Sequence, residues 1–486
     1  MPRQICSATL LILSPYFLAS CSGVPNGGCV ANCGGNNAAV SFVLTATPPA
    51  PTSQLSIQAF TATITGVTLT PSTGSAVNIP LNSSAYVAEF TRVTSDSTVL
   101  IANVSVPPGT YTQAAITFSA PRVTFCTQAD PGVPGCAAGT LATMSGSAGS
   151  ATMSTNVTLA ASQQTGFAVN ADLGAALTTS GQTVTGVSLT AANVFTLNTL
   201  PPASSATDLS SGQLSHVDDV MGLVTSASGT TLTLQTASRG SITAVANSST
   251  QYDATNCASH DFSCVQANAV AIVDTILNAD GSFTLTYYDP LTPSSEDVIE
   301  GVVTGVPDSV NNQFIVAVTD SVFAGSSSII NGQLHLGDQI VVSLVTPNPF
   351  QIISKGLQIP AGSAFLNSTS AGSILPGQTV ALIPQTFSAQ SGATLGTAST
   401  ADLALRFTRI TGVAAAVSSP TFSAAAFPPY FGLAVAQQFQ TTNGRLSLDG
   451  ISSLSSLSNG GTFSATALYL GSPSSPQFSA QAVRAH

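Results

Sequence analysis

Charged side chains are the scarcest feature of this 486-residue chain. Lysine, arginine, aspartate and glutamate together make up 6% of it, against about 25% in a typical soluble protein. Tryptophan is absent, and nine basic residues face 20 acidic ones, which gives a formal net charge of −11. Without a basic patch the chain has no electrostatic means of holding nucleic acid, so nucleic acid is not expected as a partner.

Long apolar runs are also missing. A membrane-spanning helix needs about 20 consecutive apolar residues, whereas the one compact apolar stretch, residues 8–17, is shorter and contains Pro15. Elsewhere apolar residues alternate with serine and threonine, the pattern of strands with one buried face. The sequence therefore predicts an all-β protein, long enough for three or four domains.

Recognisable catalytic motifs are absent as well. The chain contains no His-Glu-x-x-His, no Gly-x-Ser-x-Gly, no Gly-x-x-x-x-Gly-Lys-Ser/Thr and no Gly-x-Gly-x-x-Gly. Each of these spacings places a metal ligand, a nucleophile or a phosphate-binding turn, so the corresponding enzyme classes have no support. We therefore expect a protein that is not an enzyme and that carries no metal or cofactor.

Acidic residues are concentrated in the middle of the chain. Thirteen of the 20 lie between Asp218 and Asp338, where Arg239 is the only arginine or lysine. They could bind divalent cations, but no stretch has the spacing of an oxygen-ligand loop, so we expect a solvated acidic face. Two smaller groups are interpreted as the polar start of a domain and as an exposed turn before a strand: His216 with Asp218 and Asp219, and Glu296 with Asp297 and Glu300.

Aromatic side chains could provide platforms for sugar rings. With no tryptophan, the obvious candidates are Tyr287, Tyr288, Tyr430 and Phe431. Phenylalanine and tyrosine that alternate along a strand are more simply explained as core residues. The sequence leaves both interpretations open.

The N-terminus has the order of a secretory signal. Arg3 precedes the apolar residues 8–17, and Leu18-Ala19-Ser20-Cys21 follows them. This tetrapeptide resembles the lipobox of bacterial lipoproteins. The resemblance implies that residues 1–20 are removed, that Cys21 is lipidated, and that the chain is anchored in the cell envelope, at the outer membrane or cell surface. The alternative is an ordinary cleaved signal and a freely secreted protein.

Six cysteines remain after Cys6 in the signal and Cys21. They form three close pairs, which we expect to be local disulfides in an oxidising compartment: Cys29/Cys33, Cys126/Cys136 and Cys257/Cys264. Six cysteines allow 15 connectivities, so the pairing stays a prediction. His260 between the last two suggests zinc, but a fourth ligand is missing. Such bonds would close individual loops and would not join domains.

The Gly/Asn-rich residues 21–39 are predicted to be a flexible tether. Residues 40–200 are predicted to form a β-sandwich, and the Pro/Ser-rich residues 201–215 a linker after it. The Gly/Ser/Ala-rich residues 137–152 are expected to be a loop. Pro107-Pro108-Gly109-Thr110-Tyr111 is a turn typical of prealbumin-like sandwiches. Together with residues 60–69 and 167–173, it resembles the bacterial family known as domain of unknown function 4382, which implies no activity.

A repeat follows the linker. Three segments open alike, with Gly222-Leu223-Val224, Gly301-Val302-Val303 and Gly412-Val413-Ala414. They divide the rest of the chain into units at 216–300, 301–411 and 412–486. Their Gly-x-Val opening and later alternating strands resemble domain of unknown function 5666, whose units are similar to small barrels of the oligonucleotide/oligosaccharide-binding kind. The expected fold is thus a prealbumin- or immunoglobulin-like β-sandwich followed by an array of small β-barrel-like repeats.

These features favour a non-catalytic structural or interaction module. Its partners would be a membrane, through the lipid anchor, and an envelope polysaccharide or protein. A carbohydrate-binding surface lipoprotein is the alternative, and exposed tyrosine clusters would favour it. A hydrolase with a non-standard site would instead need buried, clustered acids or histidines with perturbed pKa values.

Overall fold

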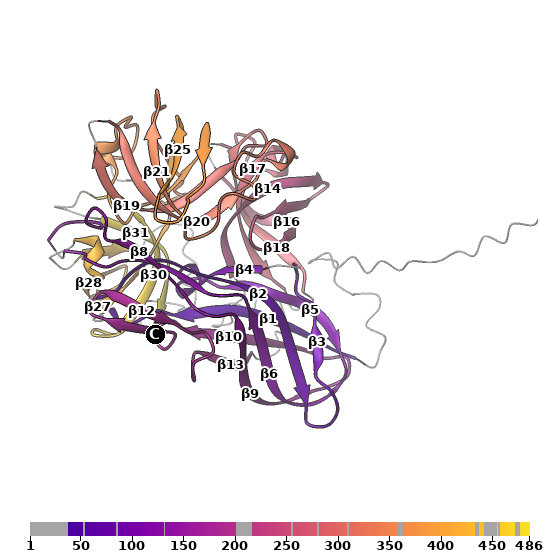
Figure 1. Cartoon of the computed structure of the whole chain (residues 1–486). Helices are drawn as coiled ribbons and strands as arrows, with labels where there is room; N and C mark the ends of the chain where they lie inside the picture. Colours follow the sequence, from indigo (N-terminus) through magenta and orange to yellow (C-terminus); the bar gives the residue numbers. More distant parts are fainter. Residues whose placement is uncertain are drawn as a thin grey trace, which may run out of the picture.

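The computed structural model describes residues 37–486, except 52–53, 84–85, 131, 201–215, 254–255, 279–280, 309–310, 358, 360–362, 433–436, 442–453, 455–456 and 472–476. The predicted signal, Cys21, Cys29, Cys33 and the linker at 201–215 lie outside the described residues. The rest consists of strands and a few short 3-10 helices, which confirms the all-β fold class. Figure 1 shows four β units grouped around a common centre.

The first unit is a sandwich of two sheets, with a small hairpin of β11 (Leu177–Ser180) and β12 (Thr183–Val187) beside it. One sheet has the order β13-β10-β1-β5, with bounds Phe195–Leu200, Gln164–Asp172, Ala38–Thr47 and Thr98–Val106. The other has the order β8-β7-β2-β6-β9, with bounds Leu141–Ser145, Arg122–Cys126, Ser56–Pro71, Gly109–Phe118 and Gly149–Leu159. Two short strands, β3 (Val77–Ile79) and β4 (Tyr86–Glu89), also pair with β2.

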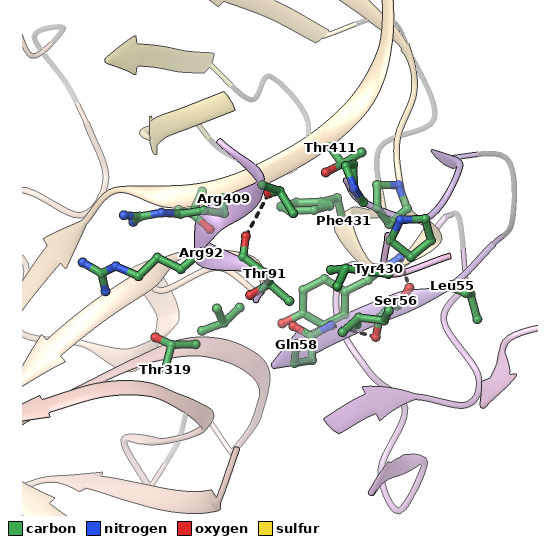
Figure 2. A pocket seen from close by; sticks show the side chains of 18 of the residues that line it. Leu55, Ser56, Gln58, Thr91, Arg92, Thr319, Arg409, Thr411, Tyr430 and Phe431 are labelled. Carbon is green, nitrogen blue, oxygen red and sulfur yellow. Dashed lines mark hydrogen bonds between the residues drawn. The ribbon is translucent and has the colours of Figure 1, made fainter. Parts of the chain in front are cut away.

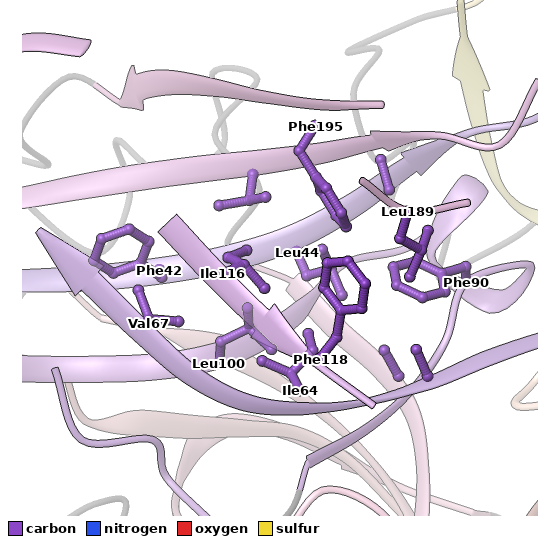
Figure 3. Close-up of a cluster of buried hydrophobic side chains, with 14 of the residues drawn as sticks. Phe42, Leu44, Ile64, Val67, Phe90, Leu100, Ile116, Phe118, Leu189 and Phe195 are labelled. Carbon is purple, nitrogen blue, oxygen red and sulfur yellow. The ribbon is translucent and has the colours of Figure 1, made fainter. Parts of the chain in front are cut away.

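The sandwich core lies between these two sheets, as Figure 3 shows. Phe42 of β1 stacks on Phe167 of β10, with ring centroids 4.8 Å apart, because the two strands are parallel and in register at this pair. Tyr111 is buried, and its hydroxyl donates a hydrogen bond of 2.8 Å to the carbonyl of Pro107. The Pro-Pro-Gly turn is therefore tied to the core by the tyrosine that follows it.

Two boundaries of the sandwich differ from expectation. The first strand begins at Ala38, inside the predicted tether. The residues expected to form a loop at 137–152 instead include β8 and the start of β9, both paired into the larger sheet. Alternation of serine and threonine with small apolar residues suffices for a strand here because neighbouring strands supply the hydrogen bonds.

The first and last repeats are closed barrels with the same strand order. The first barrel joins β14-β15-β16-β18-β17, with bounds His216–Ser228, Thr231–Gln235, Ser241–Tyr252, Phe283–Thr292 and Val270–Leu277. The last barrel joins β27-β28-β29-β31-β30, with bounds Thr408–Ser418, Thr421–Ala426, Gln437–Gln440, Gln477–Ala485 and Thr462–Tyr469. In both, the third and fifth strands pair in parallel and close the ring.

The middle unit follows the same plan but is not a closed barrel. Its sheet has the order β22-β26-β23-β19-β20-β21-β25-β24, with bounds Gln351–Ile352, Leu403–Arg406, Thr379–Leu382, Val298–Asp308, Gln313–Val322, Gln339–Leu344, Gly396–Thr400 and Thr386–Ser388. Its closing strand is split into β25, parallel to β21, and β26, antiparallel to β23. The break at Ala401 and Asp402 opens the ring.

The strands also correct the limits of the repeats. The expected boundary at residue 300 falls inside β19, and that at residue 411 falls inside β27. Each repeat therefore starts several residues before its glycine. The glycine marks the middle of the first strand, not its beginning.

The repeated glycine has the same surroundings in all three units. A Cβ atom added to Gly222, Gly301 or Gly412 would lie 2.6, 2.6 or 2.8 Å from a backbone carbonyl oxygen of the second strand. In each unit that oxygen belongs to the residue paired with the one after the glycine. Glycine is therefore required because the first two strands approach more closely here than a side chain allows.

We expect Gly222→Ala to destabilise the protein by about 1–3 kcal/mol, the usual cost of overpacking. The matched control is Gly66→Ala in β2, where the nearest atom to an added Cβ is 3.9 Å away. Urea unfolding of both variants measures the difference. Equal stability of the two variants would show that the close approach does not constrain the barrel.

Candidate functional site

The four units meet at a buried group of charged side chains, which we call the central charge cluster. The sandwich contributes one residue, the first barrel three, the middle unit four and the last barrel one. Its members are Arg92, Asp219, Arg239, Asp274, Glu300, Asp320, Lys355, Arg406 and Arg409. Ionic groups of four units that are distant in sequence are thereby brought within contact distance.

Asp219 is the focus of this cluster. It sits in a bulge of β14, between the paired residues Val217 and Val220, with a left-handed φ of 59° that aspartate tolerates better than most residues. Its carboxylate lies 2.7 Å from Arg406 Nη2 and 3.1 Å from Lys355 Nζ.

Two further cations contact the same carboxylate, because Asp219 also lies 3.2 Å from Arg409 Nη1 and 3.6 Å from Arg92 Nη2. Burial alone would raise the pKa of Asp219. The four surrounding cations outweigh that effect and hold its pKa well below the usual range.

Two other carboxylates connect the remaining cations. Glu300 of β19 lies 2.8 Å from Arg406 Nε and 3.1 Å from Arg92 Nη1. Asp320 of β20 lies 3.1 Å from Arg92 Nη1 and 2.7 Å from Arg239 Nη2. Arg92 is the only sandwich residue in the cluster, and it contacts carboxylates of two other units, the first barrel and the middle unit.

Arg92 owes its position to a buried glutamate. It opens a short 3-10 helix, η2 (Arg92–Thr94), which begins after the two residues that follow β4. Glu89, at the end of β4, accepts hydrogen bonds from the backbone N–H groups of Phe60 at 2.8 Å and Arg92 at 2.9 Å, and from the Thr91 hydroxyl at 2.6 Å. Burial raises the pKa of Glu89 despite these bonds.

Every described lysine and arginine links two units. Two of the nine basic residues, Arg3 and Arg445, lie outside the described residues. Five of the others belong to the cluster. The remaining two also cross a boundary: Arg122 of the sandwich contacts Asp338 of the middle unit at 2.7 Å, and Arg484 of the last barrel donates to the carbonyl of Val93 at 3.2 Å.

The expectation of a solvated acidic face is wrong. Asp219, Asp274, Asp289, Glu300 and Asp320 are all buried. Cations of other units contact four of them, Asp219, Asp274, Glu300 and Asp320. Among the described residues no group of three or more histidines, cysteines or acids could hold a metal ion.

The two smaller acidic groups also differ from expectation. Asp219 does not belong to a simple polar domain start, since it is fully buried in the cluster. Asp297 and Glu300 are buried instead of lying in an exposed turn. The carboxylate of Asp297 accepts from the backbone N–H groups of Ala324 at 2.7 Å and Ile329 at 2.6 Å, and so holds the loop after β20.

The aromatic candidates are core residues. Tyr287, Tyr288, Tyr430 and Phe431 are all buried, so none offers an exposed platform for a sugar ring. The Tyr430 hydroxyl donates to the carbonyl of Val303, which ties the last barrel to the middle unit. Burial raises the pKa of Tyr288 to about 12.

Both described cysteine pairs form disulfides. Cys126 is bonded to Cys136 and Cys257 to Cys264, with Cα atoms 5.7 and 5.6 Å apart. Since its sulfur atoms are bonded to each other, the second pair cannot serve with His260 as a thiolate zinc site.

The loop closed by the Cys126–Cys136 disulfide also contacts two other units, which the close spacing of the cysteines does not predict. The backbone N–H of Gly135 donates to the carbonyl of Tyr430 at 2.7 Å, and that of Cys136 to Thr304 at 2.9 Å. A local disulfide thus stabilises a loop of the sandwich that contacts two other units.

A pocket opens beside the central charge cluster, at the junction of the sandwich, the middle unit and the last barrel. It has a volume of about 110 Å³. Its lining is mixed: Figure 2 shows Arg92, Arg409 and Thr319 on one side, and Leu55, Ser56, Gln58 and Tyr430 on the other. We call it the junction pocket. The sequence showed no sign of it, because its residues come from three units.

Two further buried carboxylates, Asp253 and Asp289, lie in the first barrel. The Asn256 side chain donates to Asp289 at 3.1 Å, and the Tyr287 hydroxyl donates to Asp253 at 3.1 Å. Burial and the neighbouring charge of Asp253 raise the pKa of Asp289 to about 7.

No family model matches the chain, and no curated protein matches it. Within the described residues no helix is long and apolar enough to cross a membrane.

Arg406→Gln should lower the free energy of unfolding by about 3–5 kcal/mol, because it leaves buried carboxylates without their partner. Arg122→Gln is the matched control. Its side chain is 26% exposed, so its removal should cost about 1 kcal/mol or less. Denaturant unfolding checks both. If both variants lost the same free energy of unfolding, the cluster would contribute no more to stability than a partly exposed ion pair does.

Asp289 should make stability depend on pH. Between about pH 4, the ordinary pKa of aspartate, and the raised value of about 7, the folded state keeps the proton that the unfolded state has lost. Stability should therefore fall by up to about 4 kcal/mol as pH rises through this window and level off above it.

The measurement is urea unfolding at pH 5 and pH 8 for the wild type and for Asp289→Asn, which should lack this part of the pH dependence. Asp402→Asn removes an exposed carboxylate and is the control. An unchanged pH dependence in Asp289→Asn would show that Asp289 titrates normally.

Proposed function

We propose that this chain is a non-catalytic structural or interaction module of the cell envelope, held at the membrane by a lipid on Cys21. The observation that carries the proposal is the use of charge. In a chain with nine basic residues, each one in the described part links two β units. Charge is used to set the positions of the units relative to each other, as a scaffold requires.

Shared apolar cores support the same conclusion. Val43, Val99 and Ala168 on the outer side of the sandwich pack against the first barrel. Met221 of the first barrel packs with Val298 of the middle unit, while Leu468 and Leu470 of the last barrel join the middle core. Surfaces of different units are thus held in a constant arrangement, which suits a large partner such as an envelope polysaccharide or protein.

The alternative, a carbohydrate-binding surface lipoprotein, rests on a different observation. The aromatic candidates are buried, but a groove of about 330 Å³ lies between the sandwich, the first barrel and the middle unit. Half of its lining residues are apolar, and the other half carry hydroxyl, guanidinium or imidazole groups that can hydrogen-bond a polyhydroxylated ligand. These include Thr61, Ser119, Arg122, Ser238, Ser321 and His335.

The anchor is tested by intact mass and cell fractionation. The wild type should lose residues 1–20, gain acyl chains on Cys21 and sediment with membranes, whereas Cys21→Ala should be unacylated and soluble. Cys6→Ala, within the signal, is the control and should be acylated like the wild type. If Cys21 of the wild type were not acylated, the anchor would be wrong and the protein would be freely secreted.

The interaction itself is tested with the soluble Cys21→Ala protein, because retention then reports on the β units and not on the lipid. This protein should co-sediment with isolated envelope fragments without degrading them. Protein that stays in the supernatant, or fragments that are hydrolysed, would overturn the proposal. Retention that soluble glycans abolish would favour the carbohydrate-binding alternative.

A further inference from the structure

The sandwich has one long strand edge that is open to solvent. β9 is the last strand of the larger sheet, and β6 is its single partner among the described strands. In an antiparallel pair, alternate residues direct their N–H and C=O groups away from the neighbouring strand. On the far side of β9 these groups have no backbone partner within the described residues. Figure 1 shows β9 at the lower margin of the molecule.

Other sheet edges in the described part of the chain are covered or short. At the edge of β5 the carbonyl of Leu100 accepts a hydrogen bond of 3.1 Å from the backbone N–H of Asn82, and β8 contacts β12 of the small hairpin. β13 has six residues against 11 in β9 and leads directly into Pro201 and Pro202. The sheet of the middle unit ends in strands of two and three residues, β22 and β24. Short or covered edges do not attract further strands.

The edge of β9 also lacks the residues that usually keep a second strand away. Native edge strands commonly carry lysine, another charge or proline for this purpose. Between Asp130 and Asp208 the only charged residue is Asp172, which ends β10 in the other sheet, and β9 contains no proline. The one register shift between β9 and β6 lies after Ser154. Residues 149–154 therefore form a regular, uncharged edge.

The exposed row of this regular segment is symmetric in sequence. Ser150, Thr152 and Ser154 are exposed, whereas Ala151 is half-buried and Met153 is buried. In two antiparallel copies centred on Thr152, serine faces serine and threonine faces threonine on the exposed side. Alanine faces methionine on the other side. Serine and threonine form favourable cross-strand pairs, and no charge meets its own copy. A second copy of β9 thus fits this edge in register, face and charge.

We propose that two copies of this chain associate through β9. The strands pair antiparallel over residues 150–154 about a two-fold axis at Thr152, and the two larger sheets become one continuous sheet. Because few residues pair, the dimer is weak, with a Kd on the order of 10–100 µM. The inference does not depend on the lipid anchor or on the envelope partner proposed above.

The oligomeric state is measured by sedimentation velocity on the soluble Cys21→Ala full chain, from about 1 to 200 µM, a range that brackets the expected Kd. The protein should change from monomer to dimer as its concentration rises. Thr152→Lys places two ammonium groups opposite each other at the axis and should weaken the dimer at least about tenfold. Thr117→Lys is the matched control, because Thr117 is also exposed but lies on β6, one strand away from the edge.

The Thr117→Lys chain should dimerise like its parent. A parent chain that stays monomeric over the whole range would overturn the proposal and leave the edge to a strand of another protein. A dimer that persists equally in Thr152→Lys would place the contact elsewhere and would also overturn it. Both substituted residues are exposed, so unchanged circular dichroism should confirm that the variants fold.

The register is tested by cysteine cross-linking. Opposite residues of an antiparallel pair have Cβ atoms about 4.5–5.5 Å apart, close to the separation that a disulfide needs. Thr152→Cys should therefore form a reducible covalent dimer under mild oxidation. In the control Thr158→Cys, also on β9, the two copies of the residue would be about 40 Å apart at about 3.4 Å per residue. No cross-link at 152, or equal cross-linking of the two variants, would contradict pairing about Thr152.

Discussion

The carboxylate of Asp219 must be surrounded by cations from three other units, and the arrangement of the whole molecule depends on this requirement. Removing a charged group from water costs several kcal/mol, which only well-placed partners offset. Arg92, Lys355, Arg406 and Arg409 provide them at 2.7–3.6 Å. An arrangement that moved one unit away would leave buried charges unpaired, so the cluster favours a single placement of all four units.

This constraint also explains the junction pocket. Its polar side exists because Arg92 and Arg409 reach into the cluster from the sandwich and the last barrel, and their Nη atoms are committed to carboxylates there. Both arginines also line the pocket. The same side chains that hold the units together thus help to form a pocket that exists only when the sandwich, the middle unit and the last barrel are assembled.

Local sequence patterns predicted local structure well and interactions between units poorly. The repeated glycines at 222, 301 and 412 indicated a repeat because each strand contact needs a residue without a side chain. Close spacing similarly predicted the bonds Cys126–Cys136 and Cys257–Cys264. The excess of acid between Asp218 and Asp338 suggests a solvated face when the sequence is considered alone, because most of the compensating cations lie in other segments, at Arg92, Lys355, Arg406 and Arg409.

The sequence by itself determined the all-β class, the sandwich-then-repeat order and the local disulfides, since alternation, turn residues and close cysteines act over a few residues. Only the tertiary structure decided that the middle ring is open, that the acids are buried, and that three units share a pocket. These features depend on pairs such as Arg92 with Asp320, 228 residues apart. No local pattern encodes such a contact, because its free energy arises only when both side chains leave water together.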